Sequence, residues 1–238
     1  MNLTVCADPE ELAGAAATLF RKRLQARPDL AMAVPAGRTP RRMYRLLETF
    51  QRRTPLDYTA MHVFSVDELC PPAPPDGYFW RQVRQEFLAW AGVPPGHCHP
   101  FAVGAPDLEL MCAEYEDAIT KVGGLDLVML GLGPNGHIAS NEPGSPFDSL
   151  TRPVRLLAET VEYILTDEVI QGAVCDQAVT LGQATILAAR EVVVLVGGGA
   201  KREALRKLLE GPITPVVPAS ILQRHPRCTI IADREARP

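Results

Sequence analysis

The amino-acid sequence predicts an α/β fold: a single domain with a doubly wound, mostly parallel sheet and helices on both faces. Apolar runs without polar alternation recur along the chain, as at 125–130 and 191–196. Such runs are typical of strands that are covered on both faces. Segments with helical apolar spacing lie between them, and strands that alternate with helices form parallel sheets. No repeat or linker divides the chain, so we expect one domain over residues 1–238.

The strands are predicted from short apolar or β-branched runs bounded by turn residues. They are expected at residues 3–6, 30–34, 61–66, 125–130, 178–181, 191–196 and 228–232. The run 125–130 is the central one, because five of its six residues are apolar and a glycine-rich turn follows it.

The helices are predicted from capping residues and apolar spacing. They are expected at residues 9–25, 40–50, 78–90, 107–121, 166–172, 182–190 and 201–210. Asp8 precedes Pro9 and two glutamates, which indicates an N-cap acid with proline at the first helical position. Thr39 and Pro40 are expected to be the N-cap and the first residue of the second helix.

Composition limits the class of partner. The chain has 238 residues, 47% hydrophobic and 22% charged, with a net charge of −4. This balance gives no general attraction for nucleic acid, so any phosphate-binding site must be local. No apolar run approaches the roughly 20 residues of a membrane helix, and the amino terminus carries no secretion signal. We therefore expect a cytoplasmic protein with neither a nucleic-acid nor a membrane partner.

The cysteines and histidines suggest no metal centre. The six cysteines form no C-x-x-C pair and no regular spacing, which indicates reduced thiols. His97-Cys98-His99 resembles a ligand set, but it lies in a loop expected over 94–106 with no second ligand cluster nearby. We expect a surface loop there and no metal.

The loop after the central strand carries the first candidate site. Asn135, His137, Asn141 and Glu142 all lie in it. Open α/β sheets bind ligands at the carboxyl ends of their strands. An imidazole and a carboxylate there can exchange protons with a bound molecule. A turn with a hydrogen-bonded histidine is the alternative.

Two further candidate sites contain a basic side chain that could bind a phosphate. Gly37, Arg38 and Thr39 lie between a predicted strand and a predicted helix, where free N–H groups and the helix dipole favour a phosphate. Lys201 stands at another helix start, after the strand 191–196. A capped turn and a solvated lysine would explain the same residues without a ligand.

Asp67 and Glu68 directly follow the strand 61–66 and form the last candidate. One of them can act as a general base, or both can be solvated loop charges. The prolines within 71–75 exclude a helix or an inner strand and suit a rim or lid beside the acids.

Three motifs, in this order and spacing, resemble the glucosamine-6-phosphate deaminase/isomerase family and its relative, 6-phosphogluconolactonase. They are Gly37-Arg-Thr-Pro40, Val66-Asp-Glu68, and Gly-Pro-Asn-Gly-His-Ile-Ala-Ser-Asn-Glu-Pro-Gly at 133–144. Residues 218–225 also resemble the family's carboxyl end. The resemblance covers nearly the whole chain, and the Asn-Glu-Pro-Gly end of the third motif favours the deaminase branch.

The resemblance implies aldose–ketose isomerisation with deamination, foremost of glucosamine 6-phosphate to fructose 6-phosphate and ammonia, by acid–base catalysis without a cofactor. His137 would open the sugar ring, and Asp67 would move a proton from carbon 2 to carbon 1. The partner implied is a small sugar phosphate, and the chain would be a monomer or small homo-oligomer. The implied catalytic residues are Asp67, Asn135, His137 and Glu142, and the implied substrate or phosphate contacts are Gly37, Arg38, Thr39, Glu68, Gly136 and Lys201.

The sequence also departs from the family pattern. Leu69 replaces a usual tyrosine, Asn135 stands where many deaminases have aspartate, and Ser140 stands where they prefer phenylalanine. Two alternatives remain open: a 6-phosphogluconolactonase, in which the histidine would activate water, and a non-catalytic sugar-phosphate sensor. The two enzymes differ in product: a deaminase releases ammonia from glucosamine 6-phosphate, whereas a lactonase releases acid from the lactone. A sensor has no need of an aspartate, a histidine and a glutamate together.

Overall fold

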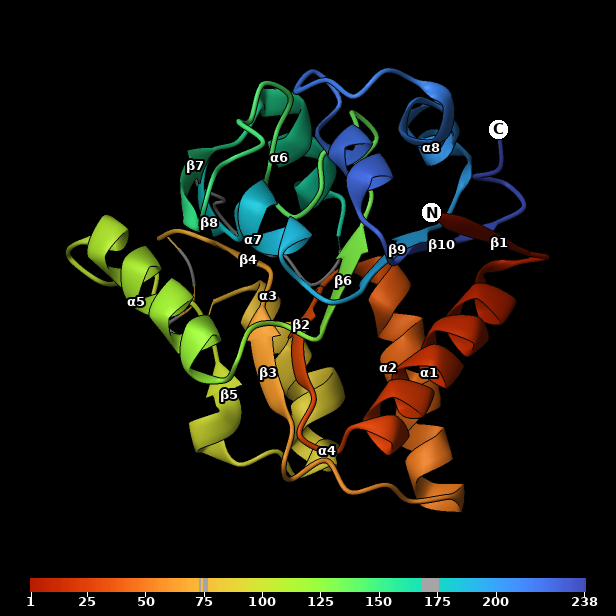
Figure 1. Cartoon of the computed structure of the whole chain (residues 1–238), viewed down its shortest axis with the longest axis vertical. Coiled ribbons are helices and arrows are strands. Elements are labelled where there is room, and N and C mark those ends of the chain that lie inside the picture. The colour runs from red at the N-terminus through yellow and green to blue at the C-terminus, as the bar shows by residue number, and fades with distance from the viewer. Residues whose placement is uncertain (73, 75–76, 168–175) are drawn as a thin grey trace.

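The main sheet of the protein is parallel throughout. The computed structural model describes residues 1–72, 74, 77–167 and 176–238. The sheet has seven strands in the order β1-β10-β9-β6-β2-β3-β5, and all neighbouring pairs are parallel (Figure 1). The strands are β1 (Asn2–Cys6), β2 (Ala31–Val34), β3 (His62–Ser65), β5 (Cys98–His99), β6 (Leu127–Gly131), β9 (Val192–Val196) and β10 (Cys228–Asp233). The predicted parallel sheet is confirmed.

Helices cover both faces of this sheet, with α1 and α2 on one side and α5 on the other (Figure 1). The α-helices are α1 (Pro9–Ala26), α2 (Arg38–Arg53), α3 (Phe79–Val83), α4 (Ala89–Ala91), α5 (Leu108–Lys121), α6 (Ala158–Leu165), α7 (Gln183–Leu187) and α8 (Arg202–Glu210). A π-helical segment, Arg84–Leu88, joins α3 to α4, and the 3₁₀ helices are Pro95–His97, Gly199–Lys201 and Pro218–Arg224. Within the described ranges, no helix has the length and apolar composition that a membrane crossing requires.

The strand β9 shows why its sequence lacks polar alternation. Val192, Val194 and Val196 belong to the hydrophobic core on the α5 face, whereas Val193 and Leu195 belong to the core on the α1 face. Successive side chains of a strand point to opposite faces. A strand buried on both faces therefore needs an apolar residue at every position, as the sequence predicts.

A second, antiparallel sheet was not predicted. It has three strands in the order β4 (Asp67–Leu69), β8 (Gln177–Thr180) and β7 (Arg152–Arg155). The expected strand at 178–181 is its middle strand. A three-residue strand and one with two arginines and a proline give no periodic signal, and their pairing joins distant parts of the chain.

The two predicted helix starts have different outcomes. The Asp8 side chain accepts hydrogen bonds from the N–H groups of Glu10 and Glu11 at 2.9 and 2.8 Å, so the first N-cap is confirmed. The prediction for Thr39 is wrong, because α2 begins at Arg38 with Gly37 as its N-cap. Gly37 has φ of 107°, a conformation that favours glycine.

Two other segments differ from expectation. The loop expected over 94–106 contains β5, which pairs with β3 at the sheet edge. There the ring nitrogens His62 Nδ1 and His99 Nε2 lie 3.1 Å apart, yet no group of three metal-ligating side chains forms in the described part of the chain. The structure has a helix, α6, before the one expected at 166–172; residues 168–172 lie outside the described ranges.

We expect Gly182→Ala to lower the melting temperature by roughly 6–12 °C, from about 3 kcal/mol of overpacking. A Cβ atom at this position would lie 2.1–2.3 Å from backbone atoms of Ser149 and Leu150. Thermal unfolding by circular dichroism measures the change. Gly104→Ala is the matched control, because a Cβ there meets nothing within 4 Å. Equal effects of the two variants would contradict the packing argument.

Candidate active site

A cavity of about 160 Å³ lies at the carboxyl ends of β2, β3, β6 and β9. It brings together the three regions singled out in the sequence: the turn after β2, the acids after β3 and the loop after β6. The predicted residues that line it are Gly37, Arg38, Thr39, Asp67, His137 and Lys201. Asp67 and His137, which are far apart in the chain, therefore face the same space.

Asp67 is the first residue of β4 and receives a hydrogen bond from Ser140 Oγ to its Oδ2 atom at 2.7 Å. Burial raises the pKa of Asp67 to about 7; the Ser140 hydrogen bond opposes this rise and the nearby Glu68 adds to it. A carboxylate with a pKa near neutrality can both accept and return a proton at physiological pH.

The structure does not support the expected substrate contact of Glu68. This side chain is 1% exposed, and its carboxylate accepts hydrogen bonds from backbone N–H groups at 2.8–3.1 Å. The donors are Leu69, Tyr78, Phe79 and Trp80. Neighbouring strand residues face opposite ways, so Asp67 meets the cavity while Glu68 fastens the start of α3.

His137 is held on its loop by close backbone contacts. A Cβ atom on Gly133 would lie 2.3–2.4 Å from the imidazole ring, so only glycine leaves room for the ring there. Asn135 Oδ1 accepts a hydrogen bond from the His137 N–H at 3.1 Å. Burial, with the positive charge of Lys201, lowers the pKa of His137 to about 4. The imidazole is therefore neutral at physiological pH and free to accept a proton.

Glu142 lies behind the histidine rather than in the cavity. His137 Nδ1 and Glu142 Oε2 are 3.7 Å apart, too far for a hydrogen bond. Among the described residues, His137 Nδ1 and Glu142 Oε1 are buried without a hydrogen-bond partner. Catalytic hydrogen bonds are often long in ligand-free proteins and shorten when substrate binds, so a shift of less than about 1 Å would complete this pair.

Asn135 connects the histidine loop to α6. Its Nδ2 group donates to Glu142 Oε2 at 2.9 Å and to Glu159 Oε1 at 3.1 Å. Thr160, next to Glu159 on α6, lines the cavity. The amide therefore orients Glu142 and ties α6 to the loop. Gly136 does not line the cavity; a Cβ on it would face Val217.

Two cations that line the cavity meet at the ring of Tyr163. The Arg38 guanidinium and the Lys201 ammonium lie 4.9 and 5.7 Å from the centre of the Tyr163 ring. Burial and, after it, the charge of Arg38 lower the pKa of Lys201 to about 8. An anion bound between these cations would relieve their repulsion. Tyr163 was not a predicted site residue, because α6 was not predicted at its position.

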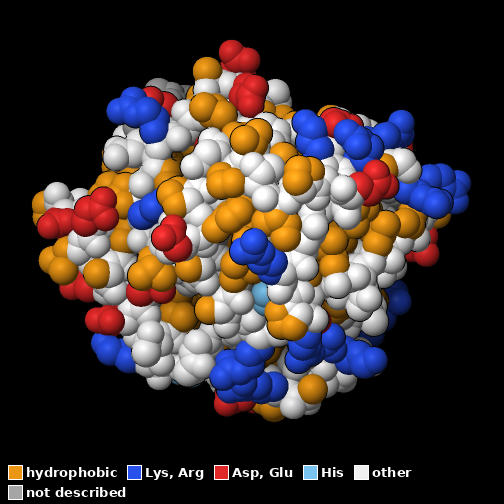
Figure 2. Space-filling view, turned by 45° about the horizontal axis from the view of Figure 1, so that its top comes forward, with side chains coloured by type: hydrophobic (Ala, Val, Ile, Leu, Met, Phe, Trp, Pro, Cys, Tyr) orange, Lys and Arg blue, Asp and Glu red, His pale blue; other side chains and the backbone are white. Residues whose placement is uncertain are grey.

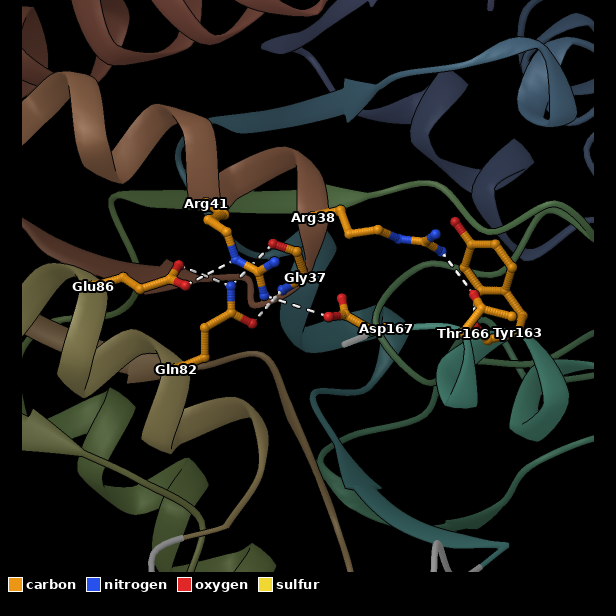
Figure 3. A network of polar contacts seen from close by, with 8 residues as sticks. All are labelled: Gly37, Arg38, Arg41, Gln82, Glu86, Tyr163, Thr166 and Asp167. Carbon is orange, nitrogen blue, oxygen red and sulfur yellow. Dashed lines mark hydrogen bonds and ion pairs between the residues drawn. The ribbon is translucent and has the colours of Figure 1, made fainter. Parts of the chain in front are cut away.

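A polar network holds the Gly37 turn (Figure 3). Gln82 Oε1 accepts from the Gly37 N–H at 2.9 Å, and Gln82 Nε2 donates to the Gly37 carbonyl at 3.0 Å. Arg41 bridges Glu86 at 2.8 Å and Asp167 at 3.3 Å. The network fixes the start of α2 against both α3 and the end of α6.

The face at the carboxyl end of β6 carries side chains of both charges (Figure 2). In Figure 2, histidine atoms are visible near the middle of this face, with Lys and Arg side chains beside them and further groups of them below. The chain as a whole is negative, with a net charge of −4. The charges that can attract an anion are therefore those of Arg38 and Lys201 at the cavity, and not that of the chain as a whole.

Comparison with known proteins identifies relatives over the full length. Residues 7–231 match the family model described as glucosamine-6-phosphate isomerases/6-phosphogluconolactonase. A glucosamine-6-phosphate deaminase of Shouchella clausii (strain KSM-K16) is 36% identical over 99% of this chain and 96% of its own. Glucosamine-6-phosphate deaminase 2 of Bacillus subtilis (strain 168) is 34% identical over the same shares, 99% and 96%.

Solved structures agree with these matches. A monomeric glucosamine-6-phosphate deaminase superposes with a TM-score of 0.93 at 32% identity, over 99% of this chain and 98% of that one. A 6-phosphogluconolactonase from Trypanosoma cruzi has a TM-score of 0.79 at 25% identity, over 99% and 95%. The likeness in both sequence and structure is greater on the deaminase side.

We expect Asp67→Asn to be more stable than the wild type at about pH 8, by about 4 kcal/mol or roughly 8–16 °C. The folded protein keeps the Asp67 proton up to a pKa of about 7, whereas an unfolded aspartate loses it near about pH 4. Wild-type stability therefore falls as pH rises between these values, and asparagine does not titrate.

Thermal unfolding at about pH 4.5 and about pH 8 tests this. The extra stability of Asp67→Asn over the wild type should be small at the lower pH and reach its full size at the higher pH. Asp148→Asn, at an exposed position, is the control and should show no such growth. An advantage of equal size at both pH values would exclude a buried, titrating Asp67.

Proposed function

The chain belongs to the glucosamine-6-phosphate isomerase/6-phosphogluconolactonase family, and from that premise we propose that it converts glucosamine 6-phosphate to fructose 6-phosphate and ammonia. One observation carries the proposal: Asp67 and His137 line a single cavity that Arg38 and Lys201 also line. This arrangement offers a base, a proton carrier and a phosphate seat around one cavity.

His137 acts first and opens the sugar ring. Opening moves a proton from the hydroxyl on carbon 1 to the ring oxygen, and a neutral imidazole can accept and return it. The low pKa of His137, about 4, keeps the ring neutral between turnovers. Glu142, drawn to hydrogen-bond distance by bound substrate, stabilises the imidazolium while it lasts, and Asn135 holds Glu142 in place.

Asp67 then performs the isomerisation. It takes the proton from carbon 2 and delivers it to carbon 1, which converts the open-chain amino aldose through an enolamine to an imine at carbon 2. Water adds to the imine and ammonia leaves, so one water is consumed for each ammonia released and the overall deamination is hydrolytic. A carboxylate with a pKa of about 7 suits both directions of proton transfer.

The phosphate lies between the Gly37 turn and Lys201. Free N–H groups at the start of α2 and the charges of Arg38 and Lys201 supply donors there. The negative charge of the bound phosphate raises the pKa of Lys201 again. The chain works as a cytoplasmic monomer that needs no cofactor; the similarity to a monomeric deaminase supports the oligomeric state.

The alternative activity is lactone hydrolysis, as in the 6-phosphogluconolactonases of similar fold. The two reactions give different products, so parallel assays of ammonia release from glucosamine 6-phosphate and acid release from 6-phosphogluconolactone distinguish them. Hydrolysis of the lactone without ammonia release would overturn the proposed function.

We expect Asp67→Asn to lower kcat by at least about 10²–10⁴-fold, because an amide cannot accept the proton from carbon 2. Substrate binding should remain measurable by calorimetry, since the phosphate contacts are unchanged. The assay is ammonia release coupled to glutamate dehydrogenase. Near-normal turnover of the variant would remove Asp67 from the mechanism.

We expect Lys201→Met to raise KM by about 10–100-fold with a smaller change in kcat, because a charged hydrogen bond to the phosphate is lost. The same assay over a range of substrate concentrations separates the two constants. Lys207→Met is the control, since this exposed lysine lies on α8 away from the cavity. A large loss of kcat at unchanged KM would place Lys201 at the reacting carbons instead.

A further inference from the structure

We infer that Ser140 is a positioning residue for the base: its hydroxyl holds Asp67 Oδ2, so that Oδ1 is the oxygen that takes the proton. The inference rests on the proposed function of Asp67. Ser140 Oγ donates to Oδ2 at 2.7 Å. In the described part of the chain no donor bonds Oδ1, and both residues line the cavity. The serine thereby decides which carboxylate oxygen is presented to the substrate.

The serine is itself held rigidly. It is 4% exposed, and its N–H donates to Thr180 Oγ1 at 3.0 Å. Thr180 is the direct antiparallel partner of Asp67 between β8 and β4. The backbone of Ser140 and the residue that it positions are therefore anchored to one strand pair. A rotation of the carboxylate would break the hydrogen bond without any gain from a second described donor.

A turn with a strained backbone conformation orients Ser140. Ala139, which precedes it, has φ of 48°, and it is the non-glycine residue with positive φ among those that the structure describes. Asn141 closes the turn: its N–H donates to Ile138 O at 3.0 Å and its Nδ2 to Leu181 O at 2.8 Å. Non-glycine residues adopt this conformation at an energetic cost. The contacts on both sides hold the turn in place.

Among the described residues, Ser140 makes the direct stabilising contact with the Asp67 carboxylate. Glu68 is turned to backbone N–H groups, and the other titratable or charged groups face the cavity from its remaining sides. They are His137 on the β6 loop, Arg38 on α2, Lys201 after β9, and Tyr163 and Asp167 at α6. Loss of the hydroxyl therefore removes the one described hydrogen bond to the carboxylate and favours its protonated form.

The test is Ser140→Ala. The acidic limb of the kcat/KM profile should move up by about one pH unit, because the lost bond stabilises the charged form. Activity should then fall about tenfold at about pH 6 and far less at about pH 9. Carbon-13 NMR of labelled aspartate, with Asp67 assigned through Asp67→Asn, should show the same upward shift of its titration.

Two further variants separate positioning from general damage. Ser65→Ala removes a serine hydroxyl that donates to the main-chain carbonyl of Asp67 at 2.8 Å, so it should leave the titration of the carboxylate in place. Ser140→Thr keeps a hydroxyl and should restore the acidic limb of the wild type. A loss of activity in Ser140→Ala that is the same at every pH, or an equal shift of the Asp67 titration in Ser65→Ala, would overturn the inference.

The NMR titration does not depend on the reaction. If the wild type releases no ammonia, the proposed function fails, while a shift in Ser140→Ala alone still supports the contact between serine and carboxylate. If ammonia is released and Asp67 titrates identically in the wild type and Ser140→Ala, the inference about Ser140 fails alone.

Discussion

The site depends on a carboxylate that is buried where the chain passes from one sheet to the other. β3 ends at Ser65, and Asp67 opens β4 two residues later. Removal of an ionised carboxylate from water is costly, and the cost appears as a pKa of about 7 for Asp67. The hydrogen bond from Ser140 reduces this cost without neutralising the group. A carboxylate held in this way can both accept and release a proton near neutral pH.

Two adjacent acids show how strongly environment decides chemistry. Glu68 is also buried, but backbone N–H groups at the start of α3 engage its carboxylate. Asp67 has one hydroxyl donor and an opening to the cavity. The strand geometry separates them, since neighbouring side chains point to opposite faces. The Glu68 side chain can hold the loop in place, whereas the Asp67 side chain can exchange a proton with a bound molecule.

The helix α6 contacts both the cations of the cavity and the loop that carries the histidine. Tyr163 contacts Arg38 and Lys201, while Glu159 accepts a hydrogen bond from Asn135, which also donates to Glu142. One short helix therefore contacts residues from three separate parts of the chain that line or support the cavity.

The parallel sheet, most of its helices and the polar loop after β6 could be predicted from the amino-acid sequence, because continuous apolar runs, capping residues and a dense polar motif are local signals. The small antiparallel sheet, the place of α6 and the different surroundings of Asp67 and Glu68 could not. Those features arise from pairing between distant segments, such as Asp67 with Thr180 and Arg38 with Tyr163. The contact between Ser140, a departure from the family pattern, and the Asp67 carboxylate has no local signal either, because it exists only after both sheets have formed.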